Sequence, residues 1–321
     1  MATTSDDFGA KALGGFMGNS GALVAFVILF TLSSLFVPFF FTLPNLVGLL
    51  LSLSFVGMGA CTMLFCLAAG EIDLSVESTA AVSGVLAAVL VNLTGSVAAG
   101  VLGGVLMGGL AGLFNGLIVA KLRLNPLIAT LATMQLVRGL AFVVSNGSAV
   151  GVSNAAFYTL GNSYFFGLPS PVWITLSCFL VFGVLFNNTA YGKYALAIGG
   201  NREAARLAGV NVDFIRIVNF TLQGLVVGFA GVILASRMTS GQPNSSTGYS
   251  MDVVSACLLG GISLSGGHAS IISAVVGVLI IATVQNAMSL LNLPTFNQYM
   301  TRGLILLAAV ILDQMKNRKR A

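Results

Sequence analysis

Residues 96–120 read SVAAGVLGGVLMGGLAGLFNGLIVA, and none of them is charged. A helix of about 20 such residues crosses the roughly 30 Å of hydrocarbon in a bilayer. Glycine recurs here at every fourth position, as Gly100, Gly104, Gly108, Gly112 and Gly116. This spacing lines one helix face with a smooth groove that a second backbone can approach closely. The stretch therefore predicts a transmembrane helix with a closely packed neighbour, and Gly224 and Gly228 repeat the spacing in a later span.

The rest of the chain has the same character. Of its 321 residues, 57% are apolar and 7% are charged, whereas about a quarter are charged in an ordinary soluble domain. So few charged side chains cannot cover the surface of a soluble fold, which excludes a soluble enzyme, a disulfide scaffold and a disordered chain. The apolar runs lack the alternation of barrel strands. The sequence therefore predicts an all-α, polytopic membrane helical bundle.

About ten spans are expected, near residues 21–38, 46–68, 76–92, 96–120, 126–144, 171–187, 214–236, 252–264, 270–291 and 299–313. The eighth is short for a full crossing, and a half-helix is the alternative. The two longest connections lie near residues 145–170 and 188–213. We therefore expect one transmembrane domain over residues 21–313, between an N-terminal tail at 1–20 and a basic tail at 314–321.

Lysine and arginine orient the bundle. An even number of spans puts both termini on one side, which then carries Lys11, Lys121, Arg123, Lys193, Arg202, Arg206, Arg216, Lys316, Arg318, Lys319 and Arg320. The other side carries Arg138, Arg237 and Arg302. This excess of positive charge predicts that both termini and both tails are cytoplasmic. The basic residues are spread over the flanks of the spans, so nucleic acid is not an expected partner.

Nucleotide, metal and catalytic motifs are missing from the sequence. Gly192-Lys193 is followed by Tyr194 where a phosphate-binding loop needs serine or threonine. His268 is the one histidine, and no serine lies in a nucleophile elbow. We therefore expect no catalytic residue, no metal and no cofactor. The four cysteines lie in apolar stretches and are expected to be packed thiols.

The carboxylates lie near the ends of the predicted spans, at Glu71, Asp73, Glu77, Asp252 and Asp313. Ion-coupled carriers keep such groups at mid-membrane depth, so this placement argues against that class. Arg138 is the deepest charge. It is either bonded between helices or a residue that lines a transport path.

Two segments match at an offset of 190 residues: Gly70-Glu71-Ile72-Asp73-Leu74-Ser75 and Gly260-Gly261-Ile262-Ser263-Leu264-Ser265. Paired glycine-interrupted segments in two halves of a transporter point to its pathway. A pair of similar helix–helix turns is the alternative. The candidate path residues are Gly70, Asp73, Ser75, Arg138, Gly260, Ser263 and Ser265.

The connection 188–213 contains the sequence Asn201-Arg202-Glu203-Ala204-Ala205-Arg206-Leu207-Ala208-Gly209. Asn201 suits a helix N-cap, Glu203 the first turn and Gly209 the position after the end. The sequence predicts a two-turn helix outside the membrane. So short a helix is marginal alone, which indicates that it docks on a partner.

The order Glu-Ala-Ala-x-x-x-Gly resembles the coupling motif of ABC-importer permeases. Gly70–Ser75 and Gly260–Gly267 resemble the paired signatures of ribose-type sugar permeases, although Glu77 stands where that family usually has glycine. More narrowly, four segments resemble L-arabinose-type members: Met63-Leu64-Phe65-Cys66-Leu67-Ala68, Thr130-Leu131-Ala132-Thr133-Met134-Gln135, Ala197-Ile198-Gly199-Gly200-Asn201, and the stretch from Ala235 to Pro243.

The resemblance implies a homodimeric permease in the bacterial inner membrane that imports a monosaccharide, L-arabinose above ribose, xylose or galactose, by alternating access. Separate ATP-binding subunits would dock on Asn201, Arg202, Glu203, Ala204, Ala205 and Gly209. A periplasmic sugar-binding protein would dock outside, where Arg237 is the candidate contact. The other classes considered are a self-sufficient carrier or channel and a scaffold or sensor subunit.

Overall fold

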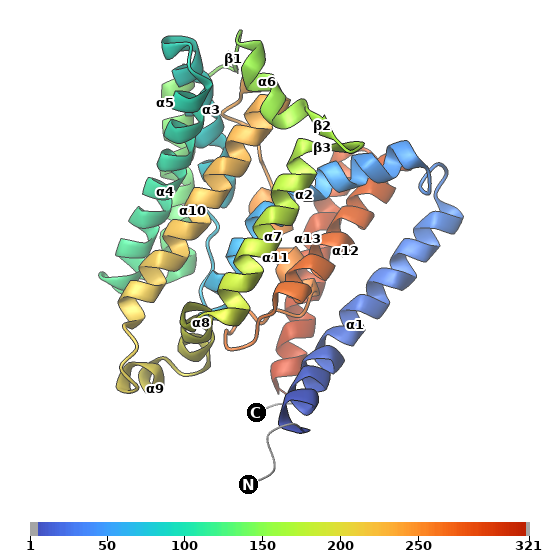
Figure 1. Ribbon diagram of the computed structural model, residues 1–321, viewed down its shortest axis with the longest axis vertical. Coiled ribbons are helices and arrows are strands. Elements are labelled where there is room, and N and C mark those ends of the chain that lie inside the picture. Colours follow the sequence, from blue (N-terminus) through green and yellow to red (C-terminus); the bar gives the residue numbers. More distant parts are fainter. Residues whose placement is uncertain (1–5, 319–321) are drawn as a thin grey trace.

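Helices account for most of residues 6–318, the part of the chain that the computed structural model describes; side chains are described for residues 21–315 (Figure 1). The long helices are α1 (Asp6–Phe36), α2 (Leu43–Ala68), α3 (Val76–Thr94), α4 (Val97–Ala120), α5 (Pro126–Ser145), α7 (Ser170–Asn188), α10 (Val212–Arg237), α12 (Ile271–Leu290) and α13 (Thr295–Arg318). The short ones are α6 (Ala155–Asn162), α8 (Ala190–Gly200), α9 (Arg202–Leu207) and α11 (Tyr249–Leu259).

Two small antiparallel strand pairings complete the fold. β1 (Val150–Gly151) pairs with β4 (Ser240–Gly241), and β2 (Tyr164–Phe165) pairs with β3 (Leu168–Pro169), both antiparallel. These pairs and α6 cover the end of the bundle that is opposite to α8 and α9 (Figure 1).

The predicted spans each overlap one helix, and the polytopic helical bundle is confirmed. Within the described residues, eight helices are long and apolar enough to cross a membrane, and Gly21–Phe36 and Tyr249–Leu259 are shorter apolar helices. The eighth predicted span is not a full helix. It is the 11-residue α11, so the half-helix alternative is the correct one.

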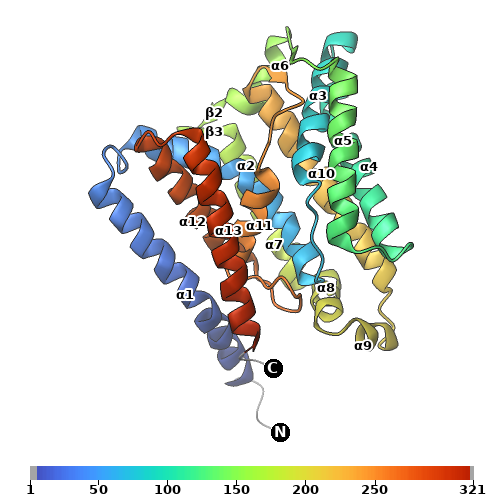
Figure 2. The same cartoon turned by 180° about the vertical axis from the view of Figure 1, so that it is seen from behind.

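The start of α1 and the end of α13 lie at the same end of the bundle as α8 and α9 (Figures 1 and 2). This agrees with an even number of crossings. The assignment of that end to the cytoplasm stays a prediction from the distribution of basic residues, as do the tail boundaries. α1 begins at Asp6, inside the predicted N-terminal tail, and residues 1–5 and 319–321 lie outside the described part.

Glycine packs α4 against α10 along the predicted groove. An added Cβ at Gly112 would collide with the carbonyl oxygen of Phe220, and one at Gly108 would collide with that of Gly224. Gly224 meets the backbone of Gly108 in return. This mutual contact of backbones explains the four-residue spacing in both helices, since a side chain at these positions would hold the helices apart.

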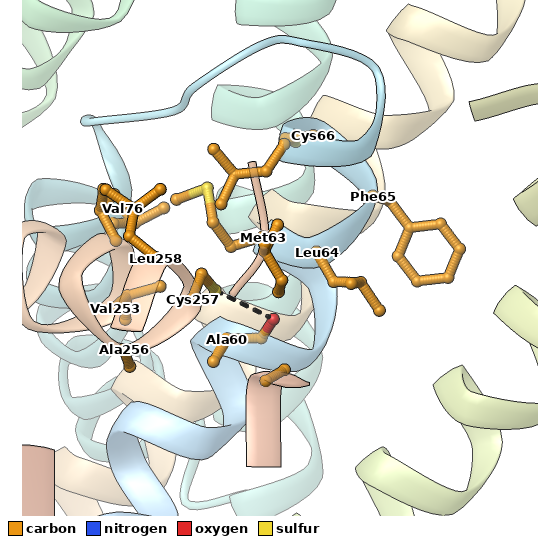
Figure 3. Close-up of a cluster of buried hydrophobic side chains, with 14 of the residues drawn as sticks. Ala60, Met63, Leu64, Phe65, Cys66, Val76, Val253, Ala256, Cys257 and Leu258 are labelled. Carbon is orange, nitrogen blue, oxygen red and sulfur yellow. Dashed lines mark hydrogen bonds between the residues drawn. The ribbon is translucent and has the colours of Figure 1, made fainter. Parts of the chain in front are cut away.

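The half-helix α11 packs deep in the bundle against α2. Figure 3 shows Met63 of α2 facing Val253 and Leu258 of α11, and the Cys257 thiol of α11 donating to the Ala60 carbonyl oxygen of α2 at 3.8 Å. The four cysteines are free thiols; Cys178 is partly exposed and the others are buried, which confirms the packed-thiol prediction.

The variant Gly112→Ala is expected to lower the free energy of unfolding by about 1–3 kcal/mol, because the new methyl group overpacks a rigid backbone contact. The matched control is Gly139→Ala on α5, where an added Cβ meets nothing within 4 Å. Thermal unfolding in detergent measures both. Equal melting temperatures for the two variants would contradict the assignment of Gly112 to the seam.

Candidate coupling and translocation site

The connection between α7 and α10 folds as its sequence predicts. The Asn201 side chain caps α9 by accepting a hydrogen bond from the Ala204 N–H at 3.0 Å. The helix ends at Leu207, and Gly209 has a φ of 85°, a left-handed conformation that glycine adopts without strain. The predicted short helix is therefore confirmed as the six-residue α9, and its place outside the membrane stays a prediction.

One side of α9 is held by the bundle and the other is open. Ala205 is buried with Ala69, Ile198 and Val212, whereas Leu207 is 82% exposed. The remaining predicted coupling residues, Asn201, Arg202, Glu203, Ala204 and Gly209, are also exposed. A polar cleft of about 690 Å³ lies beside α9 and includes Arg202, Glu203 and Arg206. This end of the molecule thus presents a small helix and a cleft to a partner.

A buried carboxylate connects α9 with the interior. Glu71 lies in the connection between α2 and α3, and its side chain is fully buried. Its Oε1 accepts a hydrogen bond from Arg216 Nε of α10 and a second from Arg202 Nη2 of α9 at 3.2 Å. Arg202 therefore links α9 directly to the segment that follows α2.

The two glycine motifs of the internal match meet beside α8. A Cβ at Gly70 would lie 3.1 Å from the Ser265 carbonyl oxygen, and the Gly267 N–H donates to the Ala68 carbonyl oxygen at 3.0 Å. Gly199 of α8 packs against Gly266 and Gly267 in the same cluster. Both motifs follow a helix that runs toward this end and precede one that runs away, so the two segments have the same orientation.

Asp73 and Ser75 form a buried polar network with Asn115 of α4. Ser75 Oγ donates to Asp73 Oδ1 at 2.6 Å, and Asn115 Nδ2 donates to Ser75 Oγ at 2.8 Å. Burial raises the pKa of the Asp73 carboxyl, which lies between the spans, to about 6 against the lowering effect of these hydrogen bonds. Sequence reasoning missed Asn115, although it is the one amide in the glycine-rich span 96–120.

The predicted path residues Gly260 and Ser263 lie in tight packing. A Cβ at Gly260 would collide with the carbonyl oxygen of Ser273 on α12, and Ser263 is buried. Ser265 sits within the glycine cluster described above. The structure therefore brings Gly70, Ser265 and their neighbours together, while Arg138 lies apart from them.

Arg138 is bonded between helices, as one of its two interpretations requires. Its Nη1 donates to the carbonyl oxygens of Pro243 at 2.5 Å and Ser245 at 3.1 Å, and its Nη2 lies 3.4 Å from Glu77 Oε1. Arg302 of α13 similarly pairs with Asp252 of α11 at 3.4 Å. Arg237, the last residue of α10, is exposed.

Glu77 and Asp252 lie near helix ends, as predicted. Both lie in the first turn of a helix, but α11 begins inside the bundle. Tyr249, at its first residue, donates to the carbonyl oxygen of Phe55 in the middle of α2. Each of these carboxylates has an arginine partner, which offsets the cost of burying its charge.

Glu71→Gln is expected to lower the free energy of unfolding by about 3–5 kcal/mol, because it leaves the buried Arg216 without a carboxylate. The control Asp213→Asn breaks an exposed ion pair with Lys121, whose side chains are 44% and 59% exposed, and should cost less than about 1 kcal/mol. Chemical unfolding in detergent compares them. A cost for Glu71→Gln as small as that of the control would show that the buried pair does not stabilise this end.

A family model described as the permease component of the branched-chain amino acid transport system matches residues 45–310. The chain is 56% identical over 298 residues to the L-arabinose transport system permease protein AraH of Escherichia coli (strain K12), covering 93% of this chain and 91% of that protein. It is 53% identical over 314 residues to the L-arabinose ABC transporter permease protein AraH of Azospirillum brasilense, covering 97% and 93%.

The chain is also 38% identical over 305 residues to the ribose import permease protein RbsC of Bacillus subtilis (strain 168), covering 94% of this chain and 95% of that protein. No solved structure matches it. With its apolar helices and matched region, the chain belongs to this family of membrane permease components.

Proposed function

We propose that this chain is the permease subunit of an ATP-driven L-arabinose importer in a bacterial inner membrane. The observation that carries the proposal is the exposed helix α9, whose sequence has the order of a coupling motif and which is tied to the interior by Arg202. The arabinose permeases among the relatives are more similar to the chain than the ribose permease is, which supports L-arabinose as the substrate.

In this proposal the ATP-binding subunits dock on α9. Leu207 and Ala204 supply apolar surface, Glu203 supplies charge, and Asn201 and Gly209 set where the helix begins and ends. When the subunits move α9, the Arg202–Glu71 ion pair passes the displacement to Gly70–Ser75. α9 and α10 then move together, because Ala205 of α9 packs in one cluster with Val212 of α10, and Arg216 of α10 binds the same Glu71 carboxylate as Arg202.

The glycine cluster beside α8 then acts as the inner closure of the path. Gly70, Gly260, Ser263 and Ser265 lie in the two connections that meet there, and Asp73 and Ser75 anchor one connection to α4. Because their backbones are in contact, a small displacement of one connection must open or reshape the other. A second copy of the chain forms the rest of the path in the homodimer.

The periplasmic sugar-binding protein docks at the opposite end, near the exposed Arg237. High-affinity recognition of the monosaccharide then lies in that protein, and the permease supplies weak polar contacts. ATP hydrolysis lies in the separate ATP-binding subunits, since this sequence holds no nucleotide-binding loop.

Reconstitution into lipid vesicles tests this function. We expect L-arabinose uptake when the chain, its ATP-binding subunits, the binding protein and ATP are all present, and no uptake when any one is left out. Uptake driven by a sugar gradient with this chain alone would identify a self-sufficient carrier. Uptake of ribose, xylose or galactose in place of L-arabinose would correct the substrate.

Glu203→Lys is expected to reduce both assembly with the ATP-binding subunits and uptake at least ten-fold, because it reverses a charge in the docking helix. Lys193→Glu on α8 reverses an exposed charge at the same end and should leave both unchanged. Co-purification and uptake are measured on the same preparations. If Glu203→Lys assembles and transports like the control, α9 is not the docking element.

Arg237→Glu is expected to weaken the affinity of the binding protein several-fold and to flatten its dependence on salt, because an exposed charge pair is lost. Titration of labelled binding protein into vesicles at two salt concentrations measures both. ATP-binding subunits should assemble normally with this variant. An unchanged affinity at low salt would remove Arg237 from the interface.

A further inference from the structure

The chain between β4 and α11 crosses part of the membrane without forming a helix. α11 has 11 residues, so it spans about 16 Å of the roughly 30 Å of hydrocarbon. Residues 242–248, which read QPNSSTG, complete the crossing. Figure 2 shows this thin orange connection descending from the outer end of the bundle to α11.

Contacts at both ends of the segment establish its course. At its upper end, a Cβ at Gly241 would lie 2.6 Å from Val85 Cα of α3. At its lower end, the Gly248 N–H donates to Glu77 Oε2, in the first turn of α3, at 3.0 Å. The segment therefore runs down along α3 and ends near the middle of the bilayer, at the level where Tyr249 bonds to Phe55.

The surface of this segment is polar although it lies at membrane depth. Asn244 and Thr247 are exposed, and Gln242, Ser245 and Ser246 are partly exposed. The buried atom Ser246 Oγ has no hydrogen-bond partner among the described residues. Lipid tails cannot satisfy such groups, so irregular backbone at this depth faces a water-filled cavity or protein.

An ion pair holds the segment in place. Arg138 of α5 donates to the carbonyl oxygens of Pro243 and Ser245, while Glu77 of α3 accepts from the Gly248 N–H and from Ser250 Oγ at 3.1 Å. Arg138 and Glu77 also pair with each other. The two side chains therefore satisfy backbone groups that a helix would have satisfied itself. Thr247 Oγ1 donates to the Asn244 carbonyl oxygen at 3.0 Å, which leaves the Asn244 amide and the acceptor side of the Thr247 hydroxyl exposed to another molecule.

We propose that residues 242–248 line the sugar path at mid-depth and that Asn244 and Thr247 hydrogen-bond to the hydroxyl groups of the passing monosaccharide. This rests on the proposed function. The Asn244 amide both donates and accepts, and the Thr247 hydroxyl, whose hydrogen is bonded to the Asn244 carbonyl oxygen, still accepts, so the pair suits a neutral polyol better than an ion. Arg138 is a positioning residue, since its guanidinium is occupied by the backbone of the segment.

Cysteine accessibility tests this assignment in the assembled complex in vesicles. Asn244→Cys and Thr247→Cys, each in a Cys178→Ala background, are treated with a charged, membrane-impermeant methanethiosulfonate. The control is Leu180→Cys on α7, which is 71% exposed on an apolar helix face. We expect both path positions to react at least ten-fold faster than the control. Reaction as slow as the control would overturn the assignment, whether lipid or a second copy covers the segment.

Uptake provides the second readout. Asn244→Ala and Thr247→Val should lower L-arabinose uptake several-fold and change the ratio of L-arabinose uptake to uptake of another pentose. Assembly with the ATP-binding subunits, and the stimulation of ATP hydrolysis by the binding protein, should be retained. Arg138→Gln should change the reaction rates of both introduced cysteines, and Arg138→Lys should bring these rates part of the way back to those with Arg138. Uptake and preference equal to the parent in both substitutions would contradict sugar contact.

The two proposals fail separately. If the parent complex imports L-arabinose but Asn244→Cys and Thr247→Cys stay unreactive, the path assignment is wrong and the importer function stands. If both cysteines react but the parent complex imports no sugar, the proposed function is wrong and the segment lines a different aqueous path.

Discussion

The absence of water in the hydrocarbon of a bilayer constrains this structure throughout, because every backbone N–H and C=O at that depth needs a partner within the protein. The long helices satisfy the requirement internally. Where the chain leaves the helix, side chains take over. Thr130 Oγ1 accepts from the Leu74 N–H, Asp313 from the Leu264 N–H and Glu77 from the Gly248 N–H. Polar residues are therefore gathered where helices are interrupted.

These interruptions are also where parts distant in the sequence meet. The segment after α2 contacts the segment after α11 through Gly70 and Gly266, and it contacts α9 through Glu71 and Arg202. Backbone contacts and buried charge pairs hold these connections together, and in the proposed importer they would transmit displacement. The continuous seam of α4 and α10, by contrast, is a direct backbone contact along two whole helices, and in the proposed importer it would be the fixed part.

Local features of the site were predictable because their causes are local. The cap at Asn201 and the turn at Gly209 depend on neighbouring residues, and the exposed short helix follows from them. The buried polar contacts were predicted less well. Asn115 was missed, and Glu77 was placed by its position at a helix start. That position says nothing about depth when the helix itself starts inside the bundle.

The sequence by itself determined that this protein is a bundle of membrane helices, since its composition allows no other way to satisfy the backbone in lipid. It also determined which helix faces pack closely, through the spacing of glycine. The tertiary structure alone decided which faces meet. Arg138 finds Glu77 and Pro243, and Arg216 finds Glu71, across long stretches of chain. Spacing along a helix defines a face but not its partner, so the charge pairs, the half-helix and the polar segment beside it emerge from packing.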